Sequence, residues 1–171
     1  MNERSARVRR WIFGILTLIT AGVIFYFSSR TGHSSAGQSG RVTRLIQKIF
    51  FPGWSDSPPE VFENQLYALQ FLVRKVAHFS IFLLLGVFAF QFLATIPIKW
   101  GLRIGICILF IALYAVSDEV HQFFTDGRSM MVFDMLVDTA GGTLGTFVSA
   151  VFSLLPENRK LREYTEKEVN Q

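Results

Sequence analysis

The sequence predicts an all-α membrane protein with four transmembrane helices. The 171-residue chain is 50% hydrophobic, only 18% of its residues are charged, and its mean hydropathy is +0.35. Its apolar residues gather into four blocks, each close to the ~20 residues that a helix needs to cross about 30 Å of hydrocarbon. These observations exclude an ordinary soluble domain and a disordered chain.

The first block, residues 11–27, follows a basic N-terminus at residues 1–10. It is longer than the ~7–15-residue apolar core of a signal peptide, so we expect an uncleaved membrane anchor. Basic residues flank the blocks at both termini and in the second turn, and the positive-inside rule therefore predicts that both termini are cytoplasmic. The later blocks and the charged cytoplasmic tail lie at residues 76–98, 104–124, 131–155 and 156–171.

The connection between the first two blocks, residues 28–75, is long for a small bundle and is predicted to be a structured outer loop. Within it, residues 39–51 predict an amphipathic helix that either lies in the interface of the outer leaflet or packs on the bundle. A second amphipathic stretch, residues 61–71, leads into the next block. The apolar stripe of the first stretch consists of Val42, Leu45, Ile46, Ile49 and Phe50.

Ionisable residues inside the apolar blocks are the strongest functional signal, because placing them in hydrocarbon costs several kcal/mol. At a rise of ~1.5 Å per residue, those of the last three blocks all fall in the outer half of the membrane. Spacings of three or four residues place them on one face of each helix, and an Asp-Gly turn places Arg128 above them. The predicted polar cluster is Lys75, His78, Asp118, Glu119, Gln122, Arg128, Asp134 and Asp138.

The four carboxylates of this cluster outnumber its permanent positive charges. They repel one another in a low-dielectric layer unless one or two are protonated or a cation lies among them. A divalent cation is therefore a candidate cofactor: the histidine permits zinc, whereas the excess of carboxylates is typical of magnesium, calcium or manganese. The alternative is a network of salt bridges that stabilises the bundle. The candidate metal ligands are Asp118, Glu119, Asp138 and His78.

Glycines predict close packing of the last helix. Gly141 and Gly145 form a GxxxG motif one turn after Asp138, and small residues at this spacing let two helix backbones approach. Gly101 and Gly105 form a second such motif at the start of the third block.

Several of these motifs together resemble the VanZ-like family of small bacterial membrane proteins. The family usually has Asn at the position of Asp138, so this chain carries one more acid there. The resemblance implies a multi-pass protein of the bacterial cell membrane with a VanZ-like core at residues 76–155, and the family's namesake lowers susceptibility to the glycopeptide teicoplanin. The match covers about residues 75–150, and the stretch Phe27-Ser28-Ser29 after the first block also resembles the family. The motifs are Lys75-x-x-His78-Phe79, Ser117-Asp118-Glu119-x-x-Gln122, Gly127-Arg128-Ser129 and Asp134-x-x-x-Asp138-x-x-Gly141-x-x-x-Gly145.

Three functions follow as hypotheses, and nucleic-acid binding is not among them, since no motif for it is present. The preferred one is a non-enzymatic envelope protein whose polar pocket binds a lipid headgroup, a lipid-linked wall precursor or a glycopeptide. In this hypothesis Lys75, His78 and Arg128 bind a phosphate or carboxylate group of the ligand. The second is a membrane-embedded enzyme that hydrolyses or transfers a group of a lipid-linked substrate, with metal assistance or with a carboxylate or His78 as general base. The third is a small transporter, which is disfavoured because the helices below the cluster are expected to be apolar.

Overall fold

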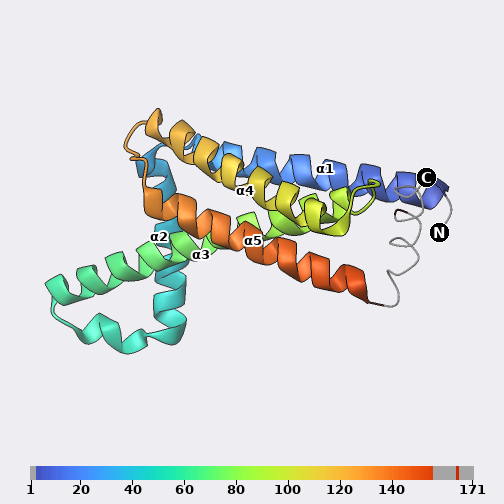
Figure 1. The fold of residues 1–171 in the computed structure, drawn as a ribbon. Coiled ribbons are helices and arrows are strands. Elements are labelled where there is room, and N and C mark those ends of the chain that lie inside the picture. Colours follow the sequence, from blue (N-terminus) through green and yellow to red (C-terminus); the bar gives the residue numbers. More distant parts are fainter. Residues whose placement is uncertain (1–2, 156–164, 166–171) are drawn as a thin grey trace.

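The computed structural model describes residues 3–155 and residue 165, and within them every regular element is helical (Figure 1). Four of the α-helices, α1, α3, α4 and α5, are long and apolar enough to cross a membrane, which confirms the prediction of an all-α chain with four such helices. The predicted tail at 156–171 lies outside the described residues except for residue 165. In chain order the elements are α1 (Glu3–Ser28), α2 (Gly32–Phe50), the short 3-10 helix η1 (Pro52–Asp56), α3 (Pro59–Leu93), α4 (Trp100–Phe123) and α5 (Val132–Leu154).

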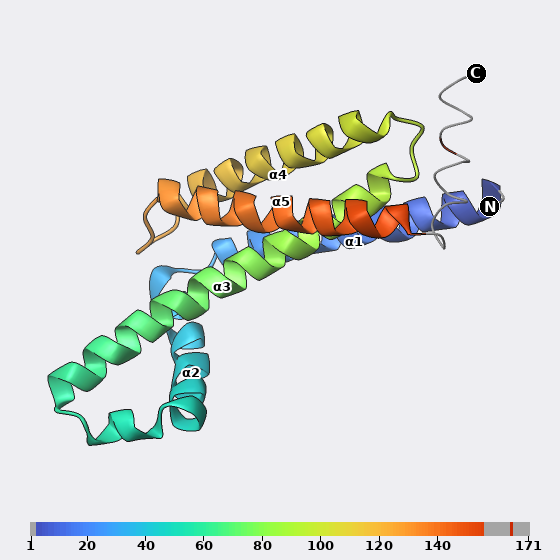
Figure 2. The same ribbon diagram turned by 60° about the horizontal axis from the view of Figure 1, so that its bottom comes forward.

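Helix α3 is the centre of the arrangement, because it contacts α1, α2, α4 and α5 (Figures 1 and 2). Helix α5 packs mainly on α3 and also on α4, and α1 lies along α3 and touches α4. Large apolar side chains on the outer faces remain exposed, as expected where lipid tails replace water; Leu18, Leu113 and Val151 are 74%, 61% and 62% exposed.

Helix α3 is longer than the span that the sequence predicts. It begins at Pro59, because proline is tolerated at the first helical position, and continues through residue 75 without a break. The stretch 61–71 is thus the first part of α3, and the predicted outer loop at 28–75 loses its last 17 residues to this helix. At ~1.5 Å per residue the 35 residues of α3 extend over about 52 Å, more than the ~30 Å of a hydrocarbon core.

The predicted end of this span, residue 98, is also shifted. Helix α3 ends at Leu93, and it cannot continue to residue 98 because Pro97 disfavours the helical conformation of Ile96. The chain then turns and α4 begins at Trp100.

Helix α2, η1 and the first part of α3 project from one end of the bundle (Figures 1 and 2). We call this the α2 end; α1 and α4 finish there and α5 begins there. At the opposite end α1 and α4 begin and α3 and α5 finish. The apolar stripe of α2 is exposed, with Leu45 at 60% and Ile49 at 61%, whereas the polar Thr43 and Gln47 are buried.

Two loops at the α2 end are joined backbone to backbone. The amide of Gly32, which begins α2, donates a hydrogen bond of 3.0 Å to the carbonyl of Asp126 in the α4–α5 connection. Gly127 follows with φ +70°, in the left-handed region that favours glycine. A Cβ atom on Gly32 would overlap the carbonyl group of Gly127, so both glycines are needed for this contact.

The interior of the bundle contains an apolar layer below the polar residues of the α2 end. This layer consists of Ile24, Phe82, Leu85, Ile111 and Ala115, all at most 3% exposed. A second apolar cluster, which includes Phe90 and Cys107, lies nearer the opposite end.

The closest helix contact is that of α5 on α3. A Cβ atom on Gly141 would meet the backbone carbonyl oxygen of Phe79, and one on Gly145 would meet that of Leu83. The contact is reciprocal, since a Cβ atom on Gly86 of α3 would meet the carbonyl oxygen of Gly142. Only glycine permits this backbone separation.

We predict that Gly145→Ala destabilises the protein by about 1–3 kcal/mol, because the added methyl group must push α5 away from α3. The matched control is Gly105→Ala on α4, where a Cβ atom has no neighbour within 4 Å. That change is expected to keep or raise the stability by up to ~1 kcal/mol through helix propensity. Thermal unfolding of the full chain in detergent measures both, and equal effects of the two substitutions would contradict the prediction.

Candidate functional site

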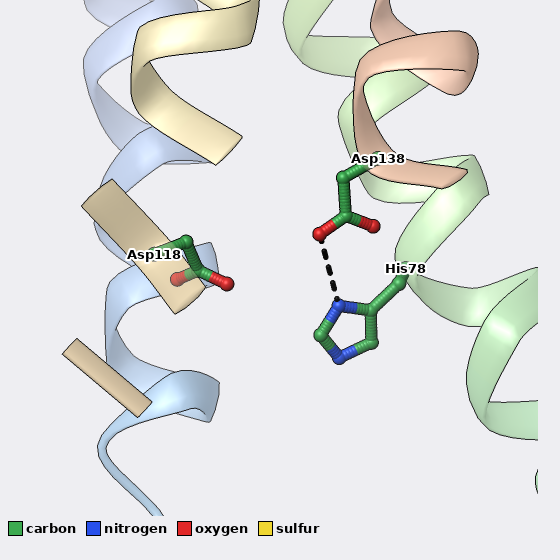
Figure 3. A group of neighbouring side chains, drawn as sticks. All are labelled: His78, Asp118 and Asp138. Atoms are coloured by element: carbon green, nitrogen blue, oxygen red, sulfur yellow. Dashed lines mark ion pairs between the residues drawn. The ribbon is translucent and has the colours of Figure 1, made fainter. Parts of the chain in front are cut away.

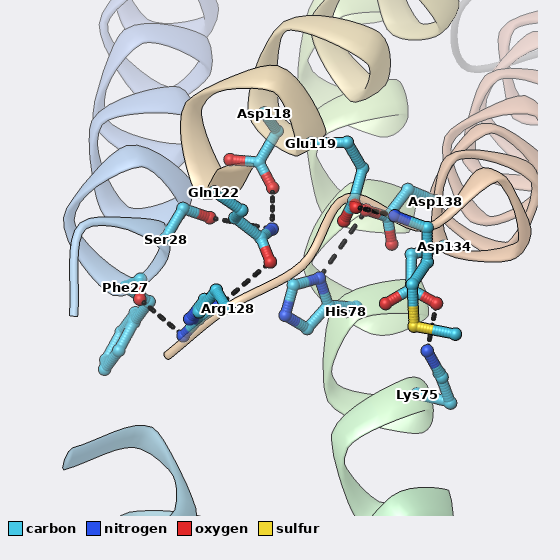
Figure 4. A network of polar contacts seen from close by, with 11 residues as sticks. Phe27, Ser28, Lys75, His78, Asp118, Glu119, Gln122, Arg128, Asp134 and Asp138 are labelled. Carbon is cyan, nitrogen blue, oxygen red and sulfur yellow. Dashed lines mark hydrogen bonds and ion pairs between the residues drawn. The ribbon is translucent and has the colours of Figure 1, made fainter. Parts of the chain in front are cut away.

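The eight residues of the predicted polar cluster all lie at the α2 end, and Figure 4 shows them between α1, α3, α4 and α5. Lys75 and His78 come from α3, Arg128 from the α4–α5 connection, and the others from α4 and α5. The members that are at most 4% exposed are Asp118, Glu119, Gln122 and Asp138. The structure therefore brings polar groups of separate helices into one buried layer.

Three side chains from three helices share the centre of this layer. His78, Asp118 and Asp138 each offer one nitrogen or oxygen atom, and these atoms lie within 4.8 Å of one another. Figure 3 shows the carboxylate of Asp118 facing the pair formed by His78 and Asp138. In that pair, His78 Nδ1 lies 3.5 Å from Asp138 Oδ2.

Asp138 is the most isolated acid of the site. Its exposed fraction is 0%, and neither of its carboxylate oxygens has a hydrogen-bond partner among the described residues. At 3.5 Å the contact with His78 is an ion-pair distance rather than a hydrogen bond. A carboxylate that is buried without hydrogen bonds is unfavourable unless a proton or a cation compensates it.

Asp118 is held by a neighbour on its own helix. Gln122, one turn later, donates from Nε2 to Asp118 Oδ2 at 2.8 Å and lies 3.4 Å from Ser28 Oγ of α1. The amide oxygen of Gln122 accepts from Arg128 at 2.8 Å. The glutamine thus fixes the orientation of the Asp118 carboxylate, and its own orientation is fixed by the arginine (Figure 4).

Arg128 joins the α4–α5 connection to the end of α1. Its guanidinium donates to the backbone carbonyls of Phe27 at 3.1 Å and Arg30 at 3.0 Å, besides Gln122. Burial lowers the pKa of Arg128, and the positive charge of Arg74 on α3 lowers it further. It stays protonated, because an arginine begins from a value far above neutrality. Arg128 thus lies between the positive charge of Arg74, which repels it, and the carboxylates of Asp118, Glu119 and Asp134, which attract it.

Glu119 and Asp134, two other acids of the cluster, have partners of their own. Glu119 Oε2 accepts from the backbone amide of Met131 at 2.9 Å and so satisfies a donor at the start of α5, while Oε1 has no hydrogen-bond partner in the described part of the chain. Asp134 forms an ion pair with Lys75 (Figure 4). Glu119, although a candidate metal ligand by sequence, is not in the group of three.

A groove opens beside the cluster between α1, α2 and α3. Its volume is about 340 Å³, within the range of small-molecule sites. Six of its thirteen lining residues are apolar, including Ile24, Val42 and Ile81, four carry hydroxyl or amide groups, and three have basic side chains. These are Arg74, His78 and Arg128.

Sequence reasoning gave neither α1 nor Arg74 a role in the site, although Phe27-Ser28-Ser29 resembles the family. Ser28 is 1% exposed and contacts Gln122, but it follows a long apolar block that contains no ionisable residue. Arg74 is next to Lys75 in the sequence, and only the position of α2 shows that it lines a groove. Ser28, at the end of the first apolar block, was the one signal in the sequence for a contribution of α1 to the site.

The expectation that the helices are apolar below the cluster was wrong. Near the opposite end Gln91 Nε2 donates to Ser149 Oγ at 2.8 Å, and Arg9 donates to Gln91 Oε1 at 2.6 Å. Arg103, only 4% exposed, donates to the carbonyls after α3. The apolar layer of Ile24, Phe82, Leu85, Ile111 and Ala115 lies between these groups and the polar cluster.

Two further polar side chains of α4 lie outside the group of three. Ser117, the hydroxyl nearest to Asp118 in sequence, is exposed. His121 stacks on Phe25 with ring centroids 4.5 Å apart and its Nε2 lies 2.9 Å from Ser29 Oγ. His121 therefore belongs to the contact between α1 and α4.

We predict that Arg128→Lys lowers the stability by about 2 kcal/mol, because one ammonium cannot bond three acceptors that a planar guanidinium spans. The amides of residues 28–32 should also exchange hydrogen faster, since the end of α1 loses its partner. The control is Arg41→Lys on the exposed side of α2. Hydrogen exchange and thermal unfolding of the full chain test this, and unchanged protection at residues 28–32 would contradict it.

The sequence was also compared with known proteins. No curated protein and no solved structure matches the chain. The sequence model of the family described as VanZ/LLP1 matches residues 13–153, which include the larger part of α1, all of α2 and the whole polar cluster as well as the region where the motifs were recognised. The chain is a multi-pass membrane protein that belongs to the VanZ/LLP1 family.

Proposed function

We propose that this protein binds a phosphate-bearing lipid of the cell envelope, either a membrane lipid or a lipid-linked wall precursor, in the groove between α1, α2 and α3. The observation that carries the proposal is the composition of the groove, in which Arg74, His78 and Arg128 lie beside apolar residues such as Val42 and Ile81. A lipid matches both parts: its phosphate takes the two guanidiniums, with His78 as a hydrogen-bonding neighbour, and its acyl chain packs on the apolar residues.

The repulsion between two of these groups supports an anionic ligand. Arg74 and Arg128 are close enough for the charge of one to lower the pKa of the other. An anion between two guanidiniums converts this repulsion into two attractions. The free donors also suit phosphate, because Arg128 uses only part of its five N–H groups on the protein.

We further propose that this groove lies in the outer leaflet of the bacterial cell membrane. Basic residues occupy the first part of α1, and Lys99 and Arg103 lie just before and in the first turn of α4, so the opposite end is assigned to the cytoplasm. The exposed apolar stripe of α2 then lies in the outer interface, with Leu45, Ile49 and Phe50 toward the acyl chains. Lipids would reach the groove sideways, past α2.

An enzyme acting on the same lipid is the second candidate. One observation favours it: His78 lines the groove and also contacts the buried carboxylate of Asp138. A histidine held by an acid beside a bound phosphate is positioned as a general base. The transporter is less well supported, because the apolar layer separates the two polar regions of the described helices.

We predict that Arg74→Gln weakens binding of phosphatidylglycerol by at least about fivefold, the effect of losing roughly 1 kcal/mol from one cation near a lipid phosphate. The full chain in nanodiscs of phosphatidylcholine with increasing phosphatidylglycerol is examined by native mass spectrometry. The control is Arg41→Gln on the exposed side of α2, outside the groove lining.

Equal retention of phosphatidylglycerol and phosphatidylcholine by the unaltered chain would contradict the proposal, as would equal losses in the two variants. A bound lipid that loses its headgroup during incubation would instead favour the enzyme.

We also expect the polar cluster to be needed for any protection against teicoplanin that this chain gives. The test compares a Gram-positive host expressing the unaltered chain with one expressing the double variant Asp118→Asn/Glu119→Gln, at membrane levels matched by immunoblot. The expected outcome is protection by the unaltered chain only. Equal protection by both would show that these carboxylates have a structural role.

A further inference from the structure

The donor atoms of His78, Asp118 and Asp138 are spaced for one metal ion. They come from α3, α4 and α5 and lie within 4.8 Å of one another (Figure 3). Ligand atoms at 2.0–2.2 Å from a metal are roughly 3–4 Å apart, so rotations of the side chains that move each atom by less than about 1 Å complete the set. The backbones need not move.

A second observation points to a bound cation. Asp138 is fully buried, and both of its carboxylate oxygens lack hydrogen-bond partners among the described residues. Polar atoms that are buried in this way are rare in folded proteins, and an ion is one of the partners that explain them. The side chain points toward His78 and the space that Asp118 faces (Figure 3).

The charges of the layer also require compensation. Lys75 and Asp134 neutralise each other, which leaves the three acids Asp118, Glu119 and Asp138 against Arg128. With His78 neutral the formal charge of the cluster is −2, or −1 when Arg74 of the groove is included, and a divalent cation compensates this excess. A neutral imidazole is also the form that binds a metal.

The surroundings orient the ligands as in a metal site. Gln122 donates to Asp118 Oδ2, and Arg128 holds Gln122 in turn. Partners of this kind fix the direction of a ligating carboxylate and are typical of metal centres. The carboxylate of Asp118 therefore keeps its second oxygen for a ligand.

We propose that His78, Asp118 and Asp138 bind one divalent transition-metal cation, of the zinc and manganese type. The donor set of one imidazole and two carboxylates matches these ions, whereas calcium requires six to eight oxygen ligands. Three protein ligands leave at least one coordination position open, and His78 places it beside the groove. This inference goes beyond the proposed lipid binding and does not depend on it.

The test measures metal binding with the full chain in detergent, without added lipid. The protein is stripped with EDTA, loaded with Zn²⁺ alone, desalted and analysed for zinc by mass spectrometry. We expect about one zinc per chain, and an at least tenfold weaker affinity in both His78→Asn and Asp138→Asn. The matched controls are His121→Asn on α4 and Asp56→Asn on the exposed η1, which are expected to bind zinc as the unaltered chain does.

A measurement on the unaltered chain covers the case in which a variant fails to fold. X-ray absorption of the loaded protein should show nitrogen and oxygen ligands, including one imidazole, and Mn²⁺ should compete for the same site. If the unaltered chain takes up neither Zn²⁺ nor Mn²⁺, or if all four variants bind zinc equally to it, the proposal is wrong. A structural network with a protonated acid or an adventitious surface ion then explains the cluster.

Discussion

The close approach of the α3 and α5 backbones is the contact on which the rest of the structure depends. Gly141 lies against the carbonyl of Phe79, one residue from His78, and follows Asp138 by less than one turn. The separation between the two backbones therefore sets the distance between the imidazole and the buried carboxylate. A larger residue at this position would separate the two chemical groups as well as the two helices. Packing and chemistry at the α2 end are thus consequences of the same glycines.

The interior is divided into layers of different polarity. Carboxylates and their partners occupy the α2 end, an apolar layer that includes Phe82 and Ile111 follows, and a second polar network around Gln91 and Ser149 lies near the opposite end. The apolar layer separates the two polar regions of the described helices, which fits the proposed binding of a ligand at one end of the bundle. Because His78 contacts Asp138 and also lines the groove, whatever occupies the groove lies next to the acids.

Much of the fold could be predicted because block length and composition are local properties. The α4 face could also be predicted, since Asp118 and Gln122 are one helical turn apart and indeed bond to each other. Pairings between residues far apart in the sequence could not be predicted. The ion pair between Lys75 and Asp134 joins two helices far apart in sequence, and the groove depends on where α2 crosses α3. The start of α3 was misplaced because its first turns are amphipathic and resemble a separate surface helix.

The GxxxG motifs show a further limit, since Gly141 and Gly145 lie against a helix backbone while the same spacing at Gly101 and Gly105 has open space. The difference has a genetic consequence. A substitution at Gly145 collides with a main-chain carbonyl, which no second mutation in a partner side chain can remove. At Gly142 the obstacle is the side chain of Ile111, which a smaller residue can relieve. Suppressor mutations should therefore arise readily for substitutions at Gly142 and be absent for substitutions at Gly145.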